Sequence, residues 1–330
     1  MPGAGESSPA PGFGDRLAAA VAARESQIVL GIDPDPARLW PDSGEDTGVQ
    51  RERLAIALVG TADAARAPSP APAAAEAAAA VLAHCRALID AAGPACVAVK
   101  PQLACFERLG SAGWLALEAA CAHARAQGLL VLADGKRGDV PVTALAYAQA
   151  LLGRTPSPFG PVDGLGVDAA TANPLLGEDA LRPLVEGARA AGAGVFVLVR
   201  TSNPGAADVM DLRLASGEPL WERLAALARD LGEAPGGGLA DVGAVTGATV
   251  PEHLARMREL MPRTPFLLPG VGAQGGDVRD LAPAFAPGRA GGLVTASRSI
   301  ANAYEAEGGE PATAARAEAE RLRSVAWGLV

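Results

Sequence analysis

Short apolar runs recur along the chain, and each ends at a polar residue or a glycine. Most of these runs are continuously apolar rather than alternating, which is typical of parallel strands buried on both faces. Eight runs predict eight strands, at residues 28–32, 95–99, 129–133, 164–167, 195–199, 242–245, 266–268 and 293–296. The fourth run differs from the others in being rich in glycine.

The segments between these runs are rich in Ala, Leu, Arg and Glu and are long enough for helices, most clearly at residues 112–127, 175–191 and 218–231. Strand and helix alternating eight times predict an α/β protein, built as a single (β/α)8 TIM barrel over residues 1–330. Residues 13–23 predict a further helix before the first strand, which caps the bottom of the barrel.

Two segments do not belong to a minimal barrel. Residues 1–12 are rich in Gly, Pro, Ser and Ala, which predicts disorder. Residues 41–72 carry mixed charge followed by Ala/Pro repeats, which favours a flexible insertion after the first strand. A second domain is the alternative for the insertion, but the segment has too few apolar positions to form a core.

Composition limits the kind of protein this is. A hydrophobic content of 49% over 330 residues supplies a sizeable core, yet no apolar run reaches the roughly 18 residues of a membrane helix. The N-terminus has neither a basic start nor an apolar core, so we expect a cytoplasmic protein. A formal net charge of -9 disfavours binding to nucleic acid or to anionic membranes, so a phosphate ligand would need local donors.

The cysteines and histidines do not form a metal or redox motif. No pair of cysteines has the Cys-x-x-Cys spacing and no histidine clusters with them, which indicates reduced, buried thiols at positions 85, 96, 105 and 121. His84, His123 and His253 fall in or near predicted helices without the spacing of a ligand set, so we interpret all three as structural.

Charged residues gather where the first three predicted strands end, and barrels of this kind place their active sites there. The third strand runs into Asp134, Lys136 and Asp139, while the first ends at Asp33 and the second at Lys100. Asp134 and Lys136 are two residues apart, so they point to one side of an extended segment. Carboxylates and ammonium groups that meet at one mouth keep each other ionised. The alternative, a solvated Asp-Gly turn, is disfavoured by the charges at neighbouring strand ends.

Glycines follow the seventh predicted strand, where Gly270, Gly272 and Gly275 satisfy the spacing GxGxxG. A dinucleotide site would place this motif early, in a βαβ unit. A phosphate cradle fits better, because glycines let backbone N–H groups approach an anion and barrels often bind phosphate after strands seven and eight. Arg298 would add a charge-assisted contact. A plain Gly-rich turn is the alternative.

Together these motifs resemble the orotidine 5'-phosphate decarboxylases. The segment from Asp134 to Asp139 resembles the DxKxxD signature of that family and is the most specific match. Further resemblances follow in order at Gly31-Ile-Asp-Pro34, Val99-Lys-Pro-Gln102, Arg200-Thr-Ser-Asn-Pro-Gly-Ala206, Pro269-Gly-Val-Gly-Ala-Gln-Gly-Gly-Asp277 and Arg298-Ser-Ile300. They cover most of the chain and look most like the longer bacterial subgroup, type 2.

The resemblance implies that orotidine 5'-monophosphate loses CO2 to give UMP in de novo pyrimidine biosynthesis, with no metal or organic cofactor. Lys136 would protonate C6 of the pyrimidine, flanked by Asp134 and Asp139. Lys100 and Asp33 would hold the charge network and contact the ribose. Further substrate contacts are implied for Thr143, Ser202, Gln274, Gly275, Gly276 and Arg298. A homodimer is also implied, with Asp139 and Thr143 donated across its interface.

Three other functions stay open on the sequence. A metal-dependent sugar-phosphate decarboxylase or synthase on the same barrel would carry an acidic residue at the end of strand two, whereas Lys100 would repel a divalent cation. A non-catalytic nucleotide-binding barrel would not need a proton donor flanked by carboxylates. A Schiff-base aldolase would need a neutral Lys136, which nearby carboxylates disfavour.

One departure from the family pattern is Ser297, where a glycine often precedes the phosphate-binding arginine.

Overall fold

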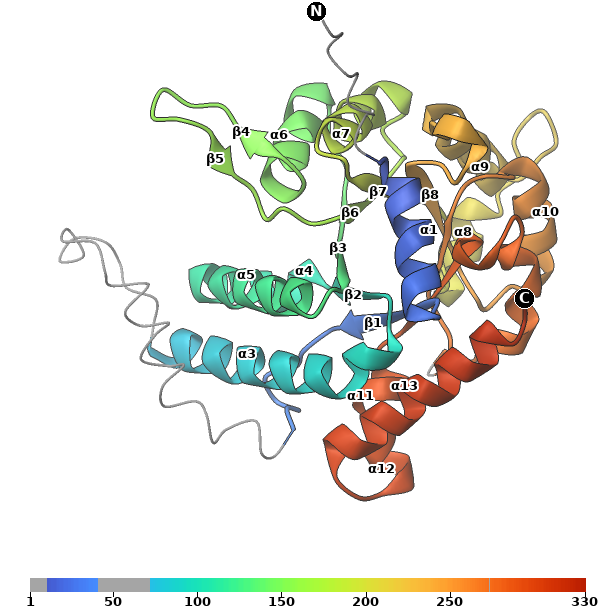
Figure 1. The fold of residues 1–330 in the computed structure, drawn as a ribbon. Coiled ribbons are helices and arrows are strands. Elements are labelled where there is room, and N and C mark those ends of the chain that lie inside the picture. The colour runs from blue at the N-terminus through green and yellow to red at the C-terminus, as the bar shows by residue number, and fades with distance from the viewer. Residues whose placement is uncertain (1–10, 41–71, 273) are drawn as a thin grey trace, which may run out of the picture.

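The computed structural model describes residues 11–40, 72–272 and 274–330. It confirms the predicted (β/α)8 barrel, in which eight parallel strands close in the order β1-β10-β9-β8-β7-β6-β3-β2 (Figure 1). These strands are β1 (Ile28–Ile32), β2 (Ala98–Pro101), β3 (Leu130–Arg137), β6 (Ala169–Ala172), β7 (Gly194–Arg200), β8 (Val242–Thr246), β9 (Phe266–Leu268) and β10 (Gly292–Ala296). The predictions for residues 1–12 and 41–72 fall almost entirely outside the described ranges.

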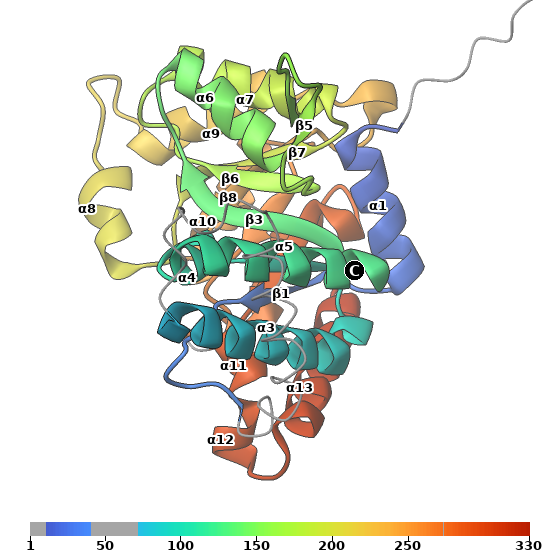
Figure 2. The ribbon, with the colours of Figure 1, turned by 90° about the vertical axis from the view of Figure 1, so that its left-hand side faces the viewer.

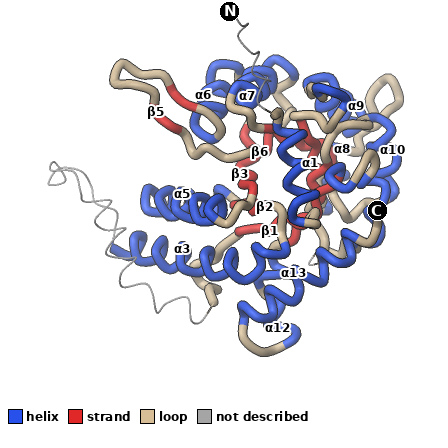
Figure 3. Tube along the Cα trace, in the orientation of Figure 1, coloured by secondary structure: helices blue, strands red, loops and turns tan. Residues whose placement is uncertain are grey.

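Helices surround the strands (Figure 3). The longer ones are α1 (Phe13–Arg24), α3 (Pro72–Ala92), α5 (Gly110–Ala126), α6 (Pro141–Leu151), α7 (Glu178–Ala190), α9 (Leu220–Leu231), α10 (Glu252–Leu260) and α13 (Pro311–Trp327). Short helices are α4 (Leu103–Glu107), α8 (Ala207–Met210), α11 (Arg298–Ala301) and α12 (Ala303–Glu307). The three clearest predicted helices correspond to α5, α7 and α9. Within the described ranges, no helix combines the length and apolarity needed to cross a bilayer.

Helix α1 closes the bottom of the barrel, as the sequence predicted. Phe13, Leu17 and Val21 recur every four residues and form one buried face. This face packs on inward-pointing side chains near the strand starts, including Val29, Ala98, Leu132, Leu267 and Leu293. The ring of Phe13 meets that of Phe196 edge-on at a centroid distance of 5.9 Å. Gly194 provides the space, since a Cβ there would lie 2.3 Å from the Phe13 ring.

The fourth strand was predicted at residues 164–167, and this prediction is wrong. The strand is β6, and residues 164–167 run along the end of α6, where the N–H of Leu165 donates to the carbonyl of Ala150. Leu165 and Val167 are buried in the shell between barrel and helices. Their apolar pattern therefore predicted a strand where the chain forms none. The real strand, Ala-Ala-Thr-Ala, has one β-branched residue and no aromatic one, and small residues have low strand propensity.

A small antiparallel hairpin outside the barrel was also not predicted. Its strands are β4 (Arg154–Thr155) and β5 (Val162–Asp163), and it follows α6 in the chain. Phe159 in its connecting loop is 98% exposed. Figure 1 shows the hairpin projecting beside α6, away from the barrel.

The last crossover, between β9 and β10, uses the 3-10 helix η5 (Val278–Phe285) where an α-helix would be expected. A buried arginine, Arg258 on α10, holds this crossover in place. Its guanidinium donates to four backbone carbonyls, those of Met261, Thr264, Ala284 and Gly291. It also lies 3.9 Å from the ring centroid of Phe266. Burial lowers the pKa of Arg258 to about 10, and the four carbonyls offset the cost of desolvating its charge.

Three of the four cysteines are buried, as the sequence indicated, and the fourth is half-buried. The four thiols are free, with Cys85, Cys96 and Cys121 buried and Cys105 half-buried. Burial raises the pKa of Cys96 and of Cys121 to about 12, which makes both thiols poor nucleophiles. The histidines serve packing and hydrogen bonding: Nδ1 of His84 accepts from the Trp40 N–H, His123 contacts Asp90, and His253 stacks on Trp221.

We predict that Phe13→Ala lowers the free energy of unfolding by about 3–5 kcal/mol, because it removes a fully buried ring from the barrel plug. Phe13→Leu should cost less, since most of the buried volume is kept. Urea denaturation followed by tryptophan fluorescence measures both. Equal free energies of unfolding for the alanine variant and wild type would show that the Phe13 ring does not contribute to stability.

Candidate active site

The upper half of the barrel interior is an open cavity of about 360 Å³. Alternation along the strands separates it from the apolar plug. On β3, Leu132 faces the plug, whereas Asp134 and Lys136 face the cavity. The structure brings seven of the predicted site residues to this cavity: Asp33, Lys100, Asp134, Lys136, Ser202, Gln274 and Arg298.

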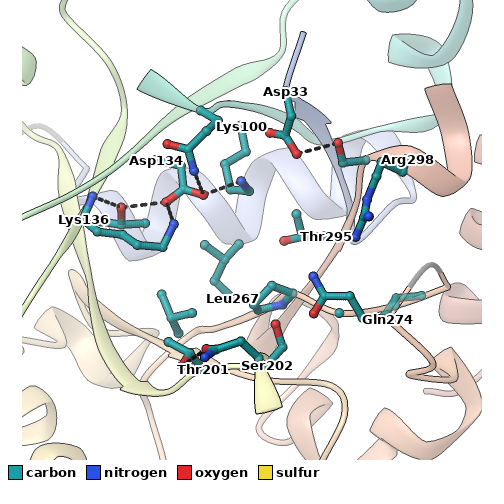
Figure 4. A pocket seen from close by; sticks show the side chains of 18 residues that line it. Asp33, Lys100, Asp134, Lys136, Thr201, Ser202, Leu267, Gln274, Thr295 and Arg298 are labelled. Carbon is teal, nitrogen blue, oxygen red and sulfur yellow. Dashed lines mark hydrogen bonds and ion pairs between the residues drawn. The ribbon is translucent and has the colours of Figure 1, made fainter. Parts of the chain in front are cut away.

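A buried carboxylate, that of Asp134, sits between two lysines (Figure 4). Its Oδ2 lies 2.5 Å from Nζ of Lys100 and its Oδ1 lies 2.6 Å from Nζ of Lys136. Thr171 donates to Oδ1 at 3.0 Å and the Gln102 amide donates to Oδ2 at 3.3 Å. Both carboxylate oxygens are therefore fully engaged, and the two ammonium groups are held on opposite sides of Asp134.

These neighbours determine the charge states. Burial by itself would raise the pKa of Asp134, but the ammonium groups of Lys100 and Lys136 outweigh it and lower that pKa to about 2. Burial would lower the pKa of Lys100, but the carboxylates of Asp134 and Asp33 raise it above its ordinary value. Asp134 is therefore an anion and Lys100 a cation throughout the physiological range.

The two lysines differ in their access to the cavity. The Lys100 side chain is 8% exposed, whereas that of Lys136 is 43% exposed. The backbone of Lys136 has a φ of 47°, in the left-handed region that a residue with a side chain rarely adopts. Its N–H donates to Oγ1 of Thr171 at 2.8 Å, which helps to hold this conformation. Strained backbone of this kind concentrates at functional sites.

At the opposite end of the cavity lie Gln274 and Arg298 (Figure 4). Arg298 begins α11 directly after β10, and Gln274 lies in the Gly-rich loop after β9. In the present conformation Gly275 and Gly276 do not line the cavity, because their N–H groups donate to the carbonyls of Gly272 and Gly270 within the loop.

Ser297, the departure from the family pattern, contacts the carboxylate of Asp33. Its hydroxyl donates to Oδ2 of Asp33 at 2.7 Å. The strands β1 and β10 are neighbours, and Gly31 leaves the space, since a Cβ there would lie 2.5 Å from Cβ of Ser297. The serine, which directly precedes Arg298, is therefore tied to the carboxylate after β1.

The loop after β7 carries Ser202 over the cavity and is anchored at both ends. Arg200 forms a two-point ion pair with Asp211, with Nη2 2.9 Å from Oδ2, and donates to the carbonyl of Thr201. The Thr249 hydroxyl donates to the carbonyl of Ser202 at 3.1 Å. These bonds fix the backbone of the loop. Figure 2 shows α8, which continues this loop, standing out from the barrel.

Asp139 and Thr143 do not reach the cavity of their own chain. Asp139 precedes α6 and accepts a hydrogen bond from the N–H of Val140, and Thr143 is exposed on the first turn of that helix. Neither residue lines the cavity of its own chain.

Two polar residues that line the cavity, Thr171 and Thr295, were missed from the sequence, whereas Gln102, Thr201 and Asn203 lie within the matched motifs but were not among the predicted site residues. Thr171 lies on the misplaced fourth strand, and the position of the others depends on register and loop shape. A polar residue at an inward position of a barrel strand is the signal that would have identified Thr171 and Thr295. Within the described ranges, no group of three or more His, Cys, Asp or Glu side chains could hold a metal ion.

The chain contains 28 lysines and arginines, and just two of them are lysines. Those two, Lys100 and Lys136, both line this cavity. An arginine keeps its proton at any accessible pH, whereas a lysine can release one. The lysine ammonium groups of the chain are thus concentrated at one place.

Fold and cavity together define a class: a (β/α)8-barrel protein with a lysine–carboxylate site at the C-terminal ends of its strands. A family model described as Orotidine 5'-phosphate decarboxylase / HUMPS family matches residues 69–317. Because this match spans well over half of the sequence, the chain belongs to that family.

Individual relatives agree with the family match. An orotidine 5'-phosphate decarboxylase of Deinococcus radiodurans is 47% identical over 238 residues, covering 71% of this chain and 82% of its own length. One from Haloarcula marismortui is 41% identical over 293 residues, covering 89% and 88%. The solved structure of a protein from Streptomyces avermitilis, described as a putative orotidine 5'-phosphate decarboxylase, has a TM-score of 0.72 and 33% identity, covering 97% of this chain and 96% of that one.

The Asp134 network predicts a specific dependence of stability on pH. The pKa of about 2 in the folded state lies below the ordinary value of 3.8, so this carboxylate stabilises the fold fully above about pH 4. That contribution, about 2 kcal/mol, is lost as the pH falls toward 2. Urea denaturation between pH 3 and pH 6 should therefore show a steeper acid loss for wild type than for Asp134→Asn.

Asp179→Asn, which changes an exposed carboxylate at the start of α7, is the matched control and should keep the wild-type slope. Parallel curves for wild type and Asp134→Asn would mean that the lysines do not hold Asp134 ionised.

Proposed function

We propose that this chain converts orotidine 5'-monophosphate to UMP and CO2 in pyrimidine biosynthesis, with Lys136 as the proton donor. The observation that carries the proposal is the position of Lys136. Its ammonium lies 2.6 Å from the buried carboxylate of Asp134, in a cavity with Gln274 and Arg298 at its other end. The names of the relatives support the same reaction.

The reaction needs a cation beside the carbon that loses CO2. As the bond from C6 to the carboxylate breaks, its electron pair stays on C6, and CO2 departs. The ammonium of Lys136 stabilises that developing negative charge more than it stabilises the uncharged carbon of the substrate. A proton then passes from Nζ to C6, which completes UMP and leaves a neutral amine to be reprotonated by solvent. Asp134 keeps the ammonium aimed at this point.

Lysine suits this role and arginine does not, because a guanidinium does not release its proton. The concentration of both lysines of the chain in this cavity therefore supports proton transfer over simple anion binding. Lys100, which is buried, supports Asp134, whereas the more exposed Lys136 meets the substrate.

The rest of the cavity fits a nucleoside monophosphate. Arg298 and Gln274 would supply a charge and an amide for the phosphate, and Asp33 and Lys100, which also line the cavity, would contact the ribose hydroxyls. Gly275 and Gly276 would join the phosphate site by turning their N–H groups out of the loop. The Ser202 hydroxyl would contact the pyrimidine. Phosphate binding, remote from C6, would contribute the energy that orders the reacting end.

We also propose a homodimer, in which Asp139 and Thr143 complete the site of the partner. Exposed apolar side chains lie on the same segment and on a neighbouring one: Val140, Val142 and Leu145 at the start of α6, and Leu175 and Leu176 in the loop before α7, a helix that packs against α6. We call these five residues the α6 patch. Apolar surface of this kind marks interaction sites, and a two-fold interface would bury the patch on both copies at once. A cytoplasmic location stays a prediction from the sequence.

The reaction can be followed by the ultraviolet absorbance of orotidine 5'-monophosphate. We expect wild-type protein stripped of metal ions to abolish the orotate band. Lys136→Ala should lower kcat by about 10²–10⁴-fold, as expected for loss of a general acid. Lys136→Arg is the matched control, because it keeps the charge but cannot deliver a proton. It should therefore bind UMP but convert orotidine 5'-monophosphate only slowly.

An unchanged orotate band with folded wild-type protein would refute the proposed reaction. Full activity of Lys136→Arg would refute proton donation by Lys136 while leaving the reaction intact. A requirement for added Mg²⁺ would favour the metal-dependent relatives on the same barrel.

Shared sites make a separate prediction. Lys136→Ala and Asp139→Ala chains are each expected to be nearly inactive, but mixing them in equal amounts should restore activity. A mixed dimer would contain one intact site, so recovery to about one quarter of the wild-type rate is the statistical limit. Mixing Lys136→Ala with Lys136→Arg is the control and should restore nothing. Failure of the first mixture, with subunit exchange demonstrated, would place Asp139 in its own chain's site.

A further inference from the structure

One hydroxyl on the cavity wall has no partner. Along β10, Leu293 packs into the plug, Val294 and Ala296 pack outward against the helix shell, and Thr295 points inward into the cavity. Thr295 is 6% exposed, and its Oγ1 makes no hydrogen bond within the described part of the chain. Figure 4 shows it between the lysine end of the cavity and the end that holds Gln274 and Arg298.

The environment of this hydroxyl contrasts with that of Thr171, the other threonine of the cavity wall. Thr171 Oγ1 donates to Asp134 and accepts from the N–H of Lys136. Its register partner on β1 is the apolar Val29, and no hydrogen bond joins its hydroxyl to any group of the described chain. A buried hydroxyl without a partner destabilises a protein, and valine would fill the same volume without that cost. The polar group therefore has no structural use in the unliganded barrel.

We propose that Thr295 is a substrate-binding residue whose hydroxyl donates to an oxygen of the ribose 5-phosphate part of the nucleotide. This inference rests on the proposed function. Its position selects that part of the ligand: Thr295 lies on the strand that leads to Arg298 and beside the strand that leads to Asp33. A ligand spanning those two residues passes directly over Thr295, and the bound oxygen supplies the missing partner.

The test compares three variants of the full chain by calorimetric titration with UMP. Thr295→Val should keep or raise the melting temperature of the ligand-free protein, yet raise the Kd for UMP by about 5- to 10-fold, the effect of losing one buried hydrogen bond. Thr295→Ser keeps the hydroxyl and should bind within about twofold of wild type. The control is Thr246→Val, since Thr246 Oγ1 is also buried without a partner but does not line the cavity. It should leave the Kd unchanged.

Competition with ribose 5-phosphate locates the contact. If Thr295 meets the ribose 5-phosphate part, Thr295→Val weakens that ligand by the same factor as UMP. Weaker UMP binding with unchanged ribose 5-phosphate binding would overturn the assignment to this part of the nucleotide. Wild-type affinity of Thr295→Val for UMP would overturn the inference altogether. If wild type itself binds no UMP, the proposed function fails first, and this inference fails with it.

Discussion

The rest of the site depends on one buried ionic interaction, the Asp134 carboxylate between Lys100 and Lys136. Three charges inside a barrel are costly unless each is paired and hydrogen-bonded, and here every carboxylate oxygen has two donors. The donors come from β2, β3 and β6, with Gln102 directly after β2, so correct closure of the barrel is a condition for the network. The network also holds Lys136 at the cavity mouth with its backbone in the left-handed region, which residues with a side chain rarely adopt.

The barrel interior has two halves with different roles. The lower half is filled by α1 and by the large apolar side chains of the strand starts, and it supplies stability. The upper half holds polar and charged side chains around open space. Side-chain alternation creates this division within single strands, as in β3, where Leu132 and Asp134 are neighbours on the same face but belong to different halves.

Much of this arrangement was predictable, because barrel strands buried on both faces appear as continuous apolar runs and active-site residues follow them. Seven of the predicted residues meet in one cavity for that reason. The fourth strand was not predictable, because the small residues of β6 give no clear apolar run. The buried Leu165 and Val167 give such a run outside any strand. The roles of Thr171 and Thr295 depend on which face of a strand they occupy. Asp139 and Thr143 do not line the cavity of their own chain, and the proposed homodimer gives them a role in the site of the partner.

The scarcity of lysine has a consequence for how this protein can be modified. Acylating enzymes and amine-reactive reagents act on lysine side chains, and on most proteins they find many harmless surface targets. In these 330 residues the accessible ε-amine is that of Lys136, because Lys100 is buried. Lysine acylation of this chain would therefore coincide with loss of the charge at its active site, and covalent immobilisation through ε-amines would block the cavity.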